Sequence, residues 1–340
     1  MIVVLGGTGL VGAHLIYELA VNGNMVKAMY RNKESIDNAY RIFSFYYDDI
    51  EKLSRHIEWV QGDIENLTIL EEILEGASTV YHCAAQVSFS SSGKRRMLEN
   101  NINGTANVVN ACLNKGVKRL CYMSSVAAIG HAGNGELINE EMIWTPSKER
   151  STYSVSKFHA EMEVWRGIEE GLSAVIVNPS IIVGPGIWGK SSTAMFDAVY
   201  KGMRFYTPGA SGFVDVRDVV NVMIMLTNSS IKGERFILNS ENLSYKDFFS
   251  LVAHSLGKKA PSIEVSRWMA EFGWRAIWIL SKITGKAPQI TRETVDSGFS
   301  SHAYSNKKIT DTLRFKFTPI AQSVKDTAKV YLEEKRLIKE

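Results

Sequence analysis

The feature that most constrains the fold of this chain is the stretch from residue 2 to residue 12, which reads IVVLGGTGLVG. Its first four residues form an uninterrupted apolar run, which predicts a strand buried on both faces of a parallel sheet. Gly6, Gly9 and Gly12 then lead into segment 10–20, whose apolar periodicity predicts a helix. A strand, a glycine turn and a helix in this order let backbone N–H groups approach a pyrophosphate at the positive end of the helix. An ordinary glycine-rich turn is the alternative, but this context favours a dinucleotide site.

The rest of the chain continues the same alternation of strands and helices. Further strands are expected over 25–30, 57–61, 79–83 and 119–123. The expected fold is therefore α/β, with a Rossmann-like, doubly wound parallel sheet whose ligands lie at the carboxyl ends of the strands. We expect residues 1–177 to form this domain and residues 178–340 to form a smaller, mostly C-terminal α/β substrate lobe. Segments near 213–240 are expected to pack against the first domain.

The residues at the strand ends indicate which cofactor the chain binds. Arg31 stands where an NAD-specific site would place a carboxylate, so it favours the 2′-phosphate of NADP, with Lys33 as a second cation. A solvated loop is the alternative, and NAD stays open. Asp63 could accept the adenine amino group or cap the following helix. Ala84 and Ala85 are small enough for a cofactor to lie against the backbone.

Charge and cysteine content argue against other classes of protein. The 39 basic and 36 acidic residues are interspersed, with a net charge of +3, so no basic stripe indicates nucleic acid. Cys83, Cys112 and Cys121 lie in apolar surroundings without CxxC spacing, which predicts reduced core thiols in a cytoplasmic protein and no metal site. We expect no signal peptide and no membrane span, since no apolar run reaches ~20 residues.

Four polar residues in the middle of the chain carry the candidate chemistry. Ser124 and Ser125 follow the predicted strand 119–123 and therefore lie at the ligand-binding edge of the sheet. Tyr153 and Lys157 are four residues apart at the start of a predicted helix, which places the phenol and the ammonium on one face. The Tyr and Lys spacing alone occurs often by chance, and only its combination with the serines and the glycine turn makes it informative.

Together, the glycine turn, Ser125, Tyr153 and Lys157 resemble the extended short-chain dehydrogenase/reductase family, part of the NAD-dependent epimerase/dehydratase superfamily. The turn is similar to the family's TGxxGxxG loop, with Leu5 in place of the first Thr. Further segments similar to family motifs lie at 62–64, 81–85, 101–105, 178–185 and 213–218. The resemblance thus covers nearly the whole chain.

The resemblance implies a role for each matching residue. Tyr153 would exchange a proton with the substrate oxygen, and Lys157 and the nicotinamide would favour its phenolate, since a free tyrosine has a pKa of ~10. Ser125 fits the family's serine better than Ser124 and would hydrogen-bond the same oxygen. Asn101 falls where the family places a helix asparagine and completes the catalytic set. The implied cofactor contacts are Gly6, Thr8, Gly9, Leu10, Val11, Gly12, Arg31, Asp63, Ile64, Ala84, Ala85, Tyr153, Lys157 and Pro179.

The segments after residue 177 favour a reductase within this family. Sugar-nucleotide epimerases of the family typically carry Arg where Asn178 stands and Tyr where Val183 stands. Segments 178–185 and 214–218 are more similar to the dihydroflavonol 4-reductase and 3β-hydroxysteroid dehydrogenase branches. The resemblance therefore implies an NADP(H)-dependent reductase of a ketone or aldehyde in a small, largely apolar molecule. A nucleotide-sugar epimerase or dehydratase with tightly bound NAD is the alternative.

One helix near the C-terminus bears on the substrate. Segment 267–283 has charged residues on a narrow stripe and apolar residues over the rest of its circumference. It could be a core helix, a lid over an apolar substrate, or a contact with a second copy of the chain or with a membrane surface. As a lid, it would present Trp268 and Trp278 to a pocket that also contains Trp188 and Phe205.

Overall fold

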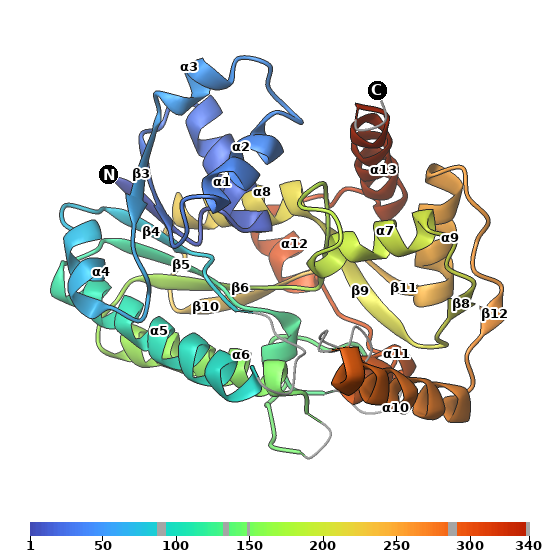
Figure 1. Cartoon of the computed structure of the whole chain (residues 1–340). Coiled ribbons are helices and arrows are strands. Elements are labelled where there is room, and N and C mark those ends of the chain that lie inside the picture. Colours follow the sequence, from blue (N-terminus) through green and yellow to red (C-terminus); the bar gives the residue numbers. More distant parts are fainter. Residues whose placement is uncertain (87–92, 132–135, 148–149, 285–290, 338–340) are drawn as a thin grey trace.

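The computed structural model describes residues 1–86, 93–131, 136–147, 150–284 and 291–337. A seven-stranded sheet with helices on both faces forms the larger part, and a smaller region packs beside it (Figure 1). The predicted α/β, Rossmann-like fold with a smaller C-terminal sheet region is confirmed. In spatial order the strands, all parallel to their neighbours, are β10 (Glu234–Leu238), β6 (Ala174–Pro179), β5 (Arg119–Met123), β4 (Thr79–His82), β1 (Ile2–Leu5), β2 (Val26–Tyr30) and β3 (Ile57–Gln61).

The first strand shows why the sheet needs helices on both faces. Val3 and Leu5 of β1 pack into one apolar core and Val4 packs into another, and all three are fully buried. Because alternate side chains of a strand point to opposite faces, a wholly apolar strand must be covered on both sides. One face is covered by α1 (Leu10–Val21), α2 (Ser35–Phe43) and α8 (Val216–Thr227), and the other by α4 (Leu67–Ile73), α5 (Lys94–Asn114) and α6 (Thr152–Glu169).

The smaller region has its own sheets and its own core. Three strands, β11 (Glu241–Ser244), β9 (Ala210–Asp215) and β7 (Ile181–Val183), form one sheet, and β12 (Ile263–Glu264) pairs with β8 (Phe205–Tyr206). The core lies between this sheet and α7 (Ala194–Tyr200), α9 (Tyr245–Ser255) and α13 (Ile320–Leu337). Phe213 and Phe248 stack at its centre, with ring centroids 4.2 Å apart. The short elements of the chain are α3 (Ile50–Ser54), α12 (Lys307–Leu313) and the 3-10 turns η1 (Val126–Ala128) and η2 (Ser191–Thr193).

Segments from the second half of the chain return to the large sheet. β10 pairs with β6, and α8 packs beside α1. No linker separates β9 from α8, because Asp215 is the last residue of the strand and also the N-cap of the helix. Its buried carboxylate accepts bonds from the backbone N–H of Arg217, at 2.7 Å, and from the guanidinium of the same residue. The division of the chain at residue 177 stays a prediction.

Two further predictions concern cysteines and membranes. Cys83, Cys112 and Cys121 are buried and free of disulfides, as the sequence predicts. Within the ranges that the structure describes, no helix is both long enough and apolar enough to cross a membrane.

Candidate active site

The glycine turn after β1 is fixed by close backbone packing. Gly6 has φ +81°, and a Cβ on it would lie 2.6 Å from the backbone nitrogen of Ala84. A Cβ on Gly12 would collide with the carbonyl oxygen of Gly6. Gly9 is the N-cap of α1, and no described side chain caps that helix end. The first N–H groups of α1 therefore stay available to an anion, and the helix dipole favours negative charge there.

A cavity of about 240 Å³ opens beside this turn. It lies at the carboxyl ends of β1, β2, β3 and β4, next to the point where the strand order reverses between β1 and β4. Ligands of doubly wound folds bind at such points. The lining residues are Gly6, Thr8, Gly9, Met29, Arg31, Gly62, Asp63, Ile64, Glu65, Cys83, Ala84, Ala85, Gln86, Asn100 and Asn101.

Not every predicted cofactor residue lines this cavity. Gly6, Thr8, Gly9, Arg31, Asp63, Ile64, Ala84 and Ala85 do. Val11 and Gly12 are buried in α1, and Leu10 approaches Gly186 of the smaller region. Pro179 is the buried last residue of β6. Tyr153 and Lys157 lie on α6, in the part of the site that follows β5.

Arg31 and Asp63 face each other across the cavity. The guanidinium Nη1 of Arg31 lies 3.8 Å from Oδ2 of Asp63, and the Arg31 side chain is 60% exposed. Asp63 does not cap the helix that follows it, since the N-cap of α4 is Asn66, whose side chain accepts from the backbone nitrogen of Ile69. Arg31 is therefore only loosely held by the protein and can reach a ligand anion.

The two serines after β5 have different partners. Ser124 is buried and donates to Oε2 of Glu161 at 2.6 Å, so its hydroxyl is engaged in the interior. The Ser125 hydroxyl accepts from the backbone N–H of Ala127 at 3.2 Å and lies beside the phenol of Tyr153, whose pKa it lowers. Of the two, Ser125 faces the candidate proton donor.

The first two turns of α6 place Tyr153 and Lys157. The helix is capped by Ser151, whose hydroxyl accepts from the backbone N–H of Ser154. Lys157 is buried and donates from Nζ to the Tyr122 hydroxyl and to the Met123 carbonyl oxygen, each at 3.0 Å. Its ammonium thus contacts the end of β5.

Burial shifts the pKa values of both groups. It raises the pKa of Tyr153, an effect that the nearby Ser125 hydroxyl opposes. Burial lowers the pKa of Lys157 to about 8, while the negative charge of Glu161 acts in the opposite direction. The phenol is therefore protonated at neutral pH.

Glu161 organises the interior behind the site. Its carboxylate, 2% exposed, accepts from Ser124 at 2.6 Å, from the amide of Asn178 at 2.7 Å and from Nη1 of Arg235 at 3.1 Å. The Asn178 amide also donates to the carbonyl oxygen of Ser125 at 3.0 Å. One carboxylate therefore ties α6 to β5, β6 and β10, the elements that position Ser125.

Asn101 of α5 holds the loop after β4. Its side chain accepts from the backbone nitrogen of Gln86 at 2.8 Å and donates to the carbonyl oxygen of Gln86 at 2.9 Å and to the Ser156 hydroxyl at 3.2 Å. It therefore joins the cavity wall to α6. In the described chain this is a positioning contact, and the catalytic role of Asn101 stays a prediction.

Sequence reasoning did not identify Glu161, Gln86 or Tyr122. A signal for Glu161 was present, because it lies four residues after Lys157 and so follows it along one face of α6. Gln86 and Tyr122 had no comparable signal, since one acts through its backbone and the other lies within a buried apolar strand.

The aromatic residues expected around an apolar substrate do not meet at one place. Trp188 packs on Tyr331 in the core of the smaller region. Phe205 is half exposed on β8, and Trp268 and Trp278 are exposed on α10 (Arg267–Thr284). None of the four expected residues lines the cavity beside the glycine turn.

A larger cavity, of about 840 Å³, lies elsewhere on the protein. Trp144, Phe158, Met162 and Trp165 contribute apolar surface to it, and its lining also includes charged residues such as Lys308. It includes none of the predicted site residues and lies on the outer face of α6, so the smaller cavity at the strand ends is the better candidate for the cofactor.

Comparisons with known proteins agree with this geometry. The family model described as "NAD dependent epimerase/dehydratase family" matches residues 2–238. A protein of Synechocystis sp. with the provisional name dihydroflavonol 4-reductase is 28% identical over 332 residues, which are 95% of this chain and 92% of that protein. The 3beta-hydroxysteroid-dehydrogenase/decarboxylase isoform 1 of Arabidopsis thaliana is 26% identical over 349 residues, with 96% of this chain and 78% of that protein covered. The crystal structure of gox2253 superposes with a TM-score of 0.79 at 27% identity and covers 99% of both chains.

Proposed function

The chain belongs to the NAD-dependent epimerase/dehydratase family, and we propose that it is an NADP(H)-dependent reductase of ketones or aldehydes in small, largely apolar molecules. As a member it is an NAD(P)-dependent enzyme of the extended short-chain dehydrogenase/reductase type. The observation that carries the proposal is that Ser125 follows β5 at the same sheet edge as the glycine-turn cavity and lies beside the Tyr153 phenol, while Lys157, one helical turn further along α6, donates to the Met123 carbonyl oxygen at the end of β5.

The residues around the cavity fit a nicotinamide dinucleotide. The uncapped start of α1 suits a pyrophosphate, and Ala84 and Ala85 leave the backbone after β4 open to the ligand. When bound, such a cofactor supplies the hydride that adds to the carbonyl carbon of the substrate.

The protein's own groups supply the proton in this scheme. Because burial raises its pKa, Tyr153 is protonated at neutral pH and can donate its proton to the carbonyl oxygen. Ser125 hydrogen-bonds the same oxygen and stabilises the charge that develops on it. Lys157 holds a positive charge beside Tyr122 and would hold the nicotinamide ribose.

Arg31 supports NADP as the preferred form of the cofactor. It lines the cavity directly after β2, and the nearest carboxylate partner, Asp63, lies 3.8 Å away. A guanidinium so placed can bind a 2′-phosphate with charge-assisted hydrogen bonds, whereas an NAD-specific site offers a carboxylate at this position.

Two observations support an apolar substrate. The names of both relatives described above refer to dihydroflavonol and steroid chemistry. In addition, a sugar nucleotide would bring two phosphates, which need cationic partners when desolvated. Segment 178–212 offers Lys190, Lys201 and Arg204, all exposed, and Lys201 already pairs with Asp197 at 2.5 Å.

The test is a panel assay with NADPH. We expect oxidation of NADPH in proportion to bulky apolar or aromatic carbonyls, and no response to UDP-sugars or GDP-sugars. The alternative is a nucleotide-sugar epimerase or dehydratase with tightly bound NAD, which the name of the matching family supports. Thermal stabilisation by a sugar nucleotide, together with a silent carbonyl panel and no net cofactor consumption, would establish that alternative instead.

A further inference from the structure

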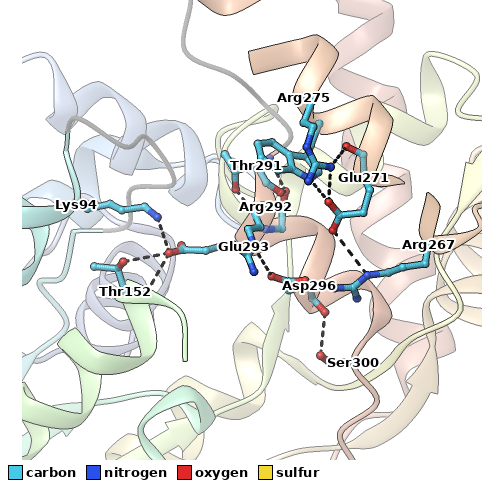
Figure 2. A network of polar contacts seen from close by, with 12 residues as sticks. Lys94, Thr152, Arg267, Glu271, Arg275, Thr291, Arg292, Glu293, Asp296 and Ser300 are labelled. Carbon is cyan, nitrogen blue, oxygen red and sulfur yellow. Dashed lines mark hydrogen bonds and ion pairs between the residues drawn. The ribbon is translucent and has the colours of Figure 1, made fainter. Parts of the chain in front are cut away.

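Glu293 lies where three helices begin. It stands in the first turn of α11 (Arg292–Phe299), while Lys94 and Thr152 are the first residues of α5 and α6. Its Oε1 accepts from Lys94 Nζ at 2.6 Å, from the Thr152 hydroxyl at 3.1 Å and from the Thr152 backbone nitrogen at 3.3 Å (Figure 2). The Glu293 side chain is only 19% exposed. Three helix N-termini and one ammonium thus surround a single carboxylate, an arrangement that favours its negative charge.

Through Thr152 this carboxylate acts on the helix that carries the candidate chemistry. Thr152 directly precedes Tyr153, and Glu293 is an acceptor for an N–H group of the first turn, which has no partner within the helix. Through Lys94 it also holds the start of α5, the helix of Asn101. Glu293 therefore joins the two helices on which the site is built.

On its other side, Glu293 belongs to a helical pair formed by α10 and α11. Asp296 of α11 binds Arg267 of α10 at 2.6 Å, and Arg267 and Arg275 both reach Glu271 (Figure 2). After α11 the backbone joins the smaller sheet, where Ala210 donates to the carbonyl oxygen of Ser300. The end of α11 is thus fixed by backbone bonds, and its start is fixed by Glu293.

We propose that Glu293 is a positioning residue that fixes the first turn of α6, and with it the Tyr153 phenol relative to Ser125, while it holds the α10–α11 pair against the site. The proposal rests on the proposed function for the role of Tyr153. Glu293 is not proposed as a catalytic residue, because its contacts in the described chain are to Thr152 and Lys94 and not to Tyr153 itself.

The first test follows the helix and needs no substrate. Amide hydrogen exchange of residues 154–157 is compared in the unmodified protein, in Glu293→Ala and in Glu293→Gln. We expect exchange at least about tenfold faster in Glu293→Ala and intermediate in Glu293→Gln, whose amide oxygen can still accept from Thr152. Glu163→Gln is the matched control, since Glu163 pairs with Arg166 on the same helix away from its first turn. Exchange in Glu293→Ala equal to that of the control would overturn the proposal.

The second test follows the chemistry, with NADPH and the best carbonyl of the panel. Glu293→Ala should lower kcat about ten- to a hundredfold with the Kd for NADPH unchanged, because small misplacements of reacting groups reduce rates by such factors. The alkaline limb of the kcat profile should move to higher pH, because a displaced phenol would lose part of the interaction with Ser125 that lowers the pKa of Tyr153. Glu293→Gln should recover part of the rate.

Thr152→Val and Thr152→Ser provide a second pair of variants if Glu293→Ala does not fold. The valine removes the hydroxyl that Glu293 accepts from and should lower kcat, while the serine keeps it and should not. If Glu293→Ala showed faster exchange but an unchanged kcat and pH profile, Glu293 would be only a structural residue, and the positioning role would be overturned. If the unmodified protein reduces no carbonyl, the proposed function fails, and the exchange experiment still decides whether Glu293 holds the first turns of α6.

Discussion

Removal of the Glu161 carboxylate should destabilise the protein more than any exposed ion pair of the same helix. Glu161 is 2% exposed, its partner Arg235 is 18% exposed, and three neutral donors, Ser124, Asn178 and Trp165, also bind the carboxylate. Breaking a buried pair from one side costs about 3–5 kcal/mol because a charge stays buried without its partner. Arg235 keeps bonds to the carbonyl oxygens of Glu140 and Met142, which places Glu161→Ala near about 3 kcal/mol.

Two further variants distinguish the loss of the buried charge from the loss of a partly exposed ion pair. Glu161→Gln keeps the size of the side chain and an acceptor for Ser124 or Asn178, so we expect a loss of about 1–3 kcal/mol. Glu163→Gln removes a carboxylate whose pair with Arg166 is partly exposed, and such pairs contribute about 0–1 kcal/mol.

The assay is thermal unfolding followed by circular dichroism, with urea unfolding as a second measure. At roughly 2 °C per kcal/mol for a chain of this size, Glu161→Ala should lower the Tm by about 6 °C and Glu163→Gln by less than about 2 °C. Equal shifts in the two variants would refute the idea that the Glu161 network holds α6 to the sheet.

Three other predictions concern the site itself. Arg31→Ala should reduce the preference for NADPH over NADH about tenfold or more, since a hydrogen bond to a charged group contributes ~1.5–3 kcal/mol. Equal affinities of the unmodified protein for the two cofactors, measured by calorimetry, would contradict this role of Arg31. Tyr153→Phe should abolish turnover and leave the Kd for NADPH nearly unchanged, whereas Lys157→Ala should impair both; a Tyr153→Phe enzyme with more than about a tenth of the rate would require another proton donor. Burial lowers the pKa of Lys157 to about 8 in the folded chain, whereas the pKa in the unfolded chain is ~10.4. The folded state therefore loses this proton first as the pH rises. The free energy of unfolding should increase between about pH 8 and about pH 10.4 as a result. The free energy of unfolding of Lys157→Met, measured with urea, should lack this increase. An identical pH dependence in Lys157→Met and the unmodified protein would contradict the prediction.

Local patterns in the sequence predict the parts of this protein that depend on neighbouring residues. The strands predicted at 57–61 and 119–123 coincide with β3 and β5. The last four residues of β5 form the apolar run typical of a buried parallel strand, whereas β3 is an edge strand with exposed Glu58 and Gln61. The glycine turn could be predicted from its local spacing, although only Gly12 is required by packing within one strand, turn and helix. Gly6 is required by its positive φ and by the close backbone of Ala84 after β4.

The contacts between distant segments could not be read from the sequence. Glu161 and Arg235 are 74 residues apart, and Glu293 and Thr152 are 141 residues apart, so no spacing marks either pair. The contact of Lys157 with Tyr122 could not be read from the sequence either, because it depends on the packing of α6 against β5. The aromatic residues expected around the substrate are separated because Trp188 is used in the core under α13.

The direct passage from β9 into α8 at Asp215 limits how the two parts of the molecule can move. Asp215 ends a strand of the smaller sheet and caps a helix of the large one, and its carboxylate is held by both the backbone and the guanidinium of Arg217. A hinge needs residues whose φ and ψ can change, and a residue that is strand, cap and ion-pair partner at once cannot supply them. Rotation of the whole smaller region about this crossing would therefore have to break both the helix cap and the ion pair of Asp215.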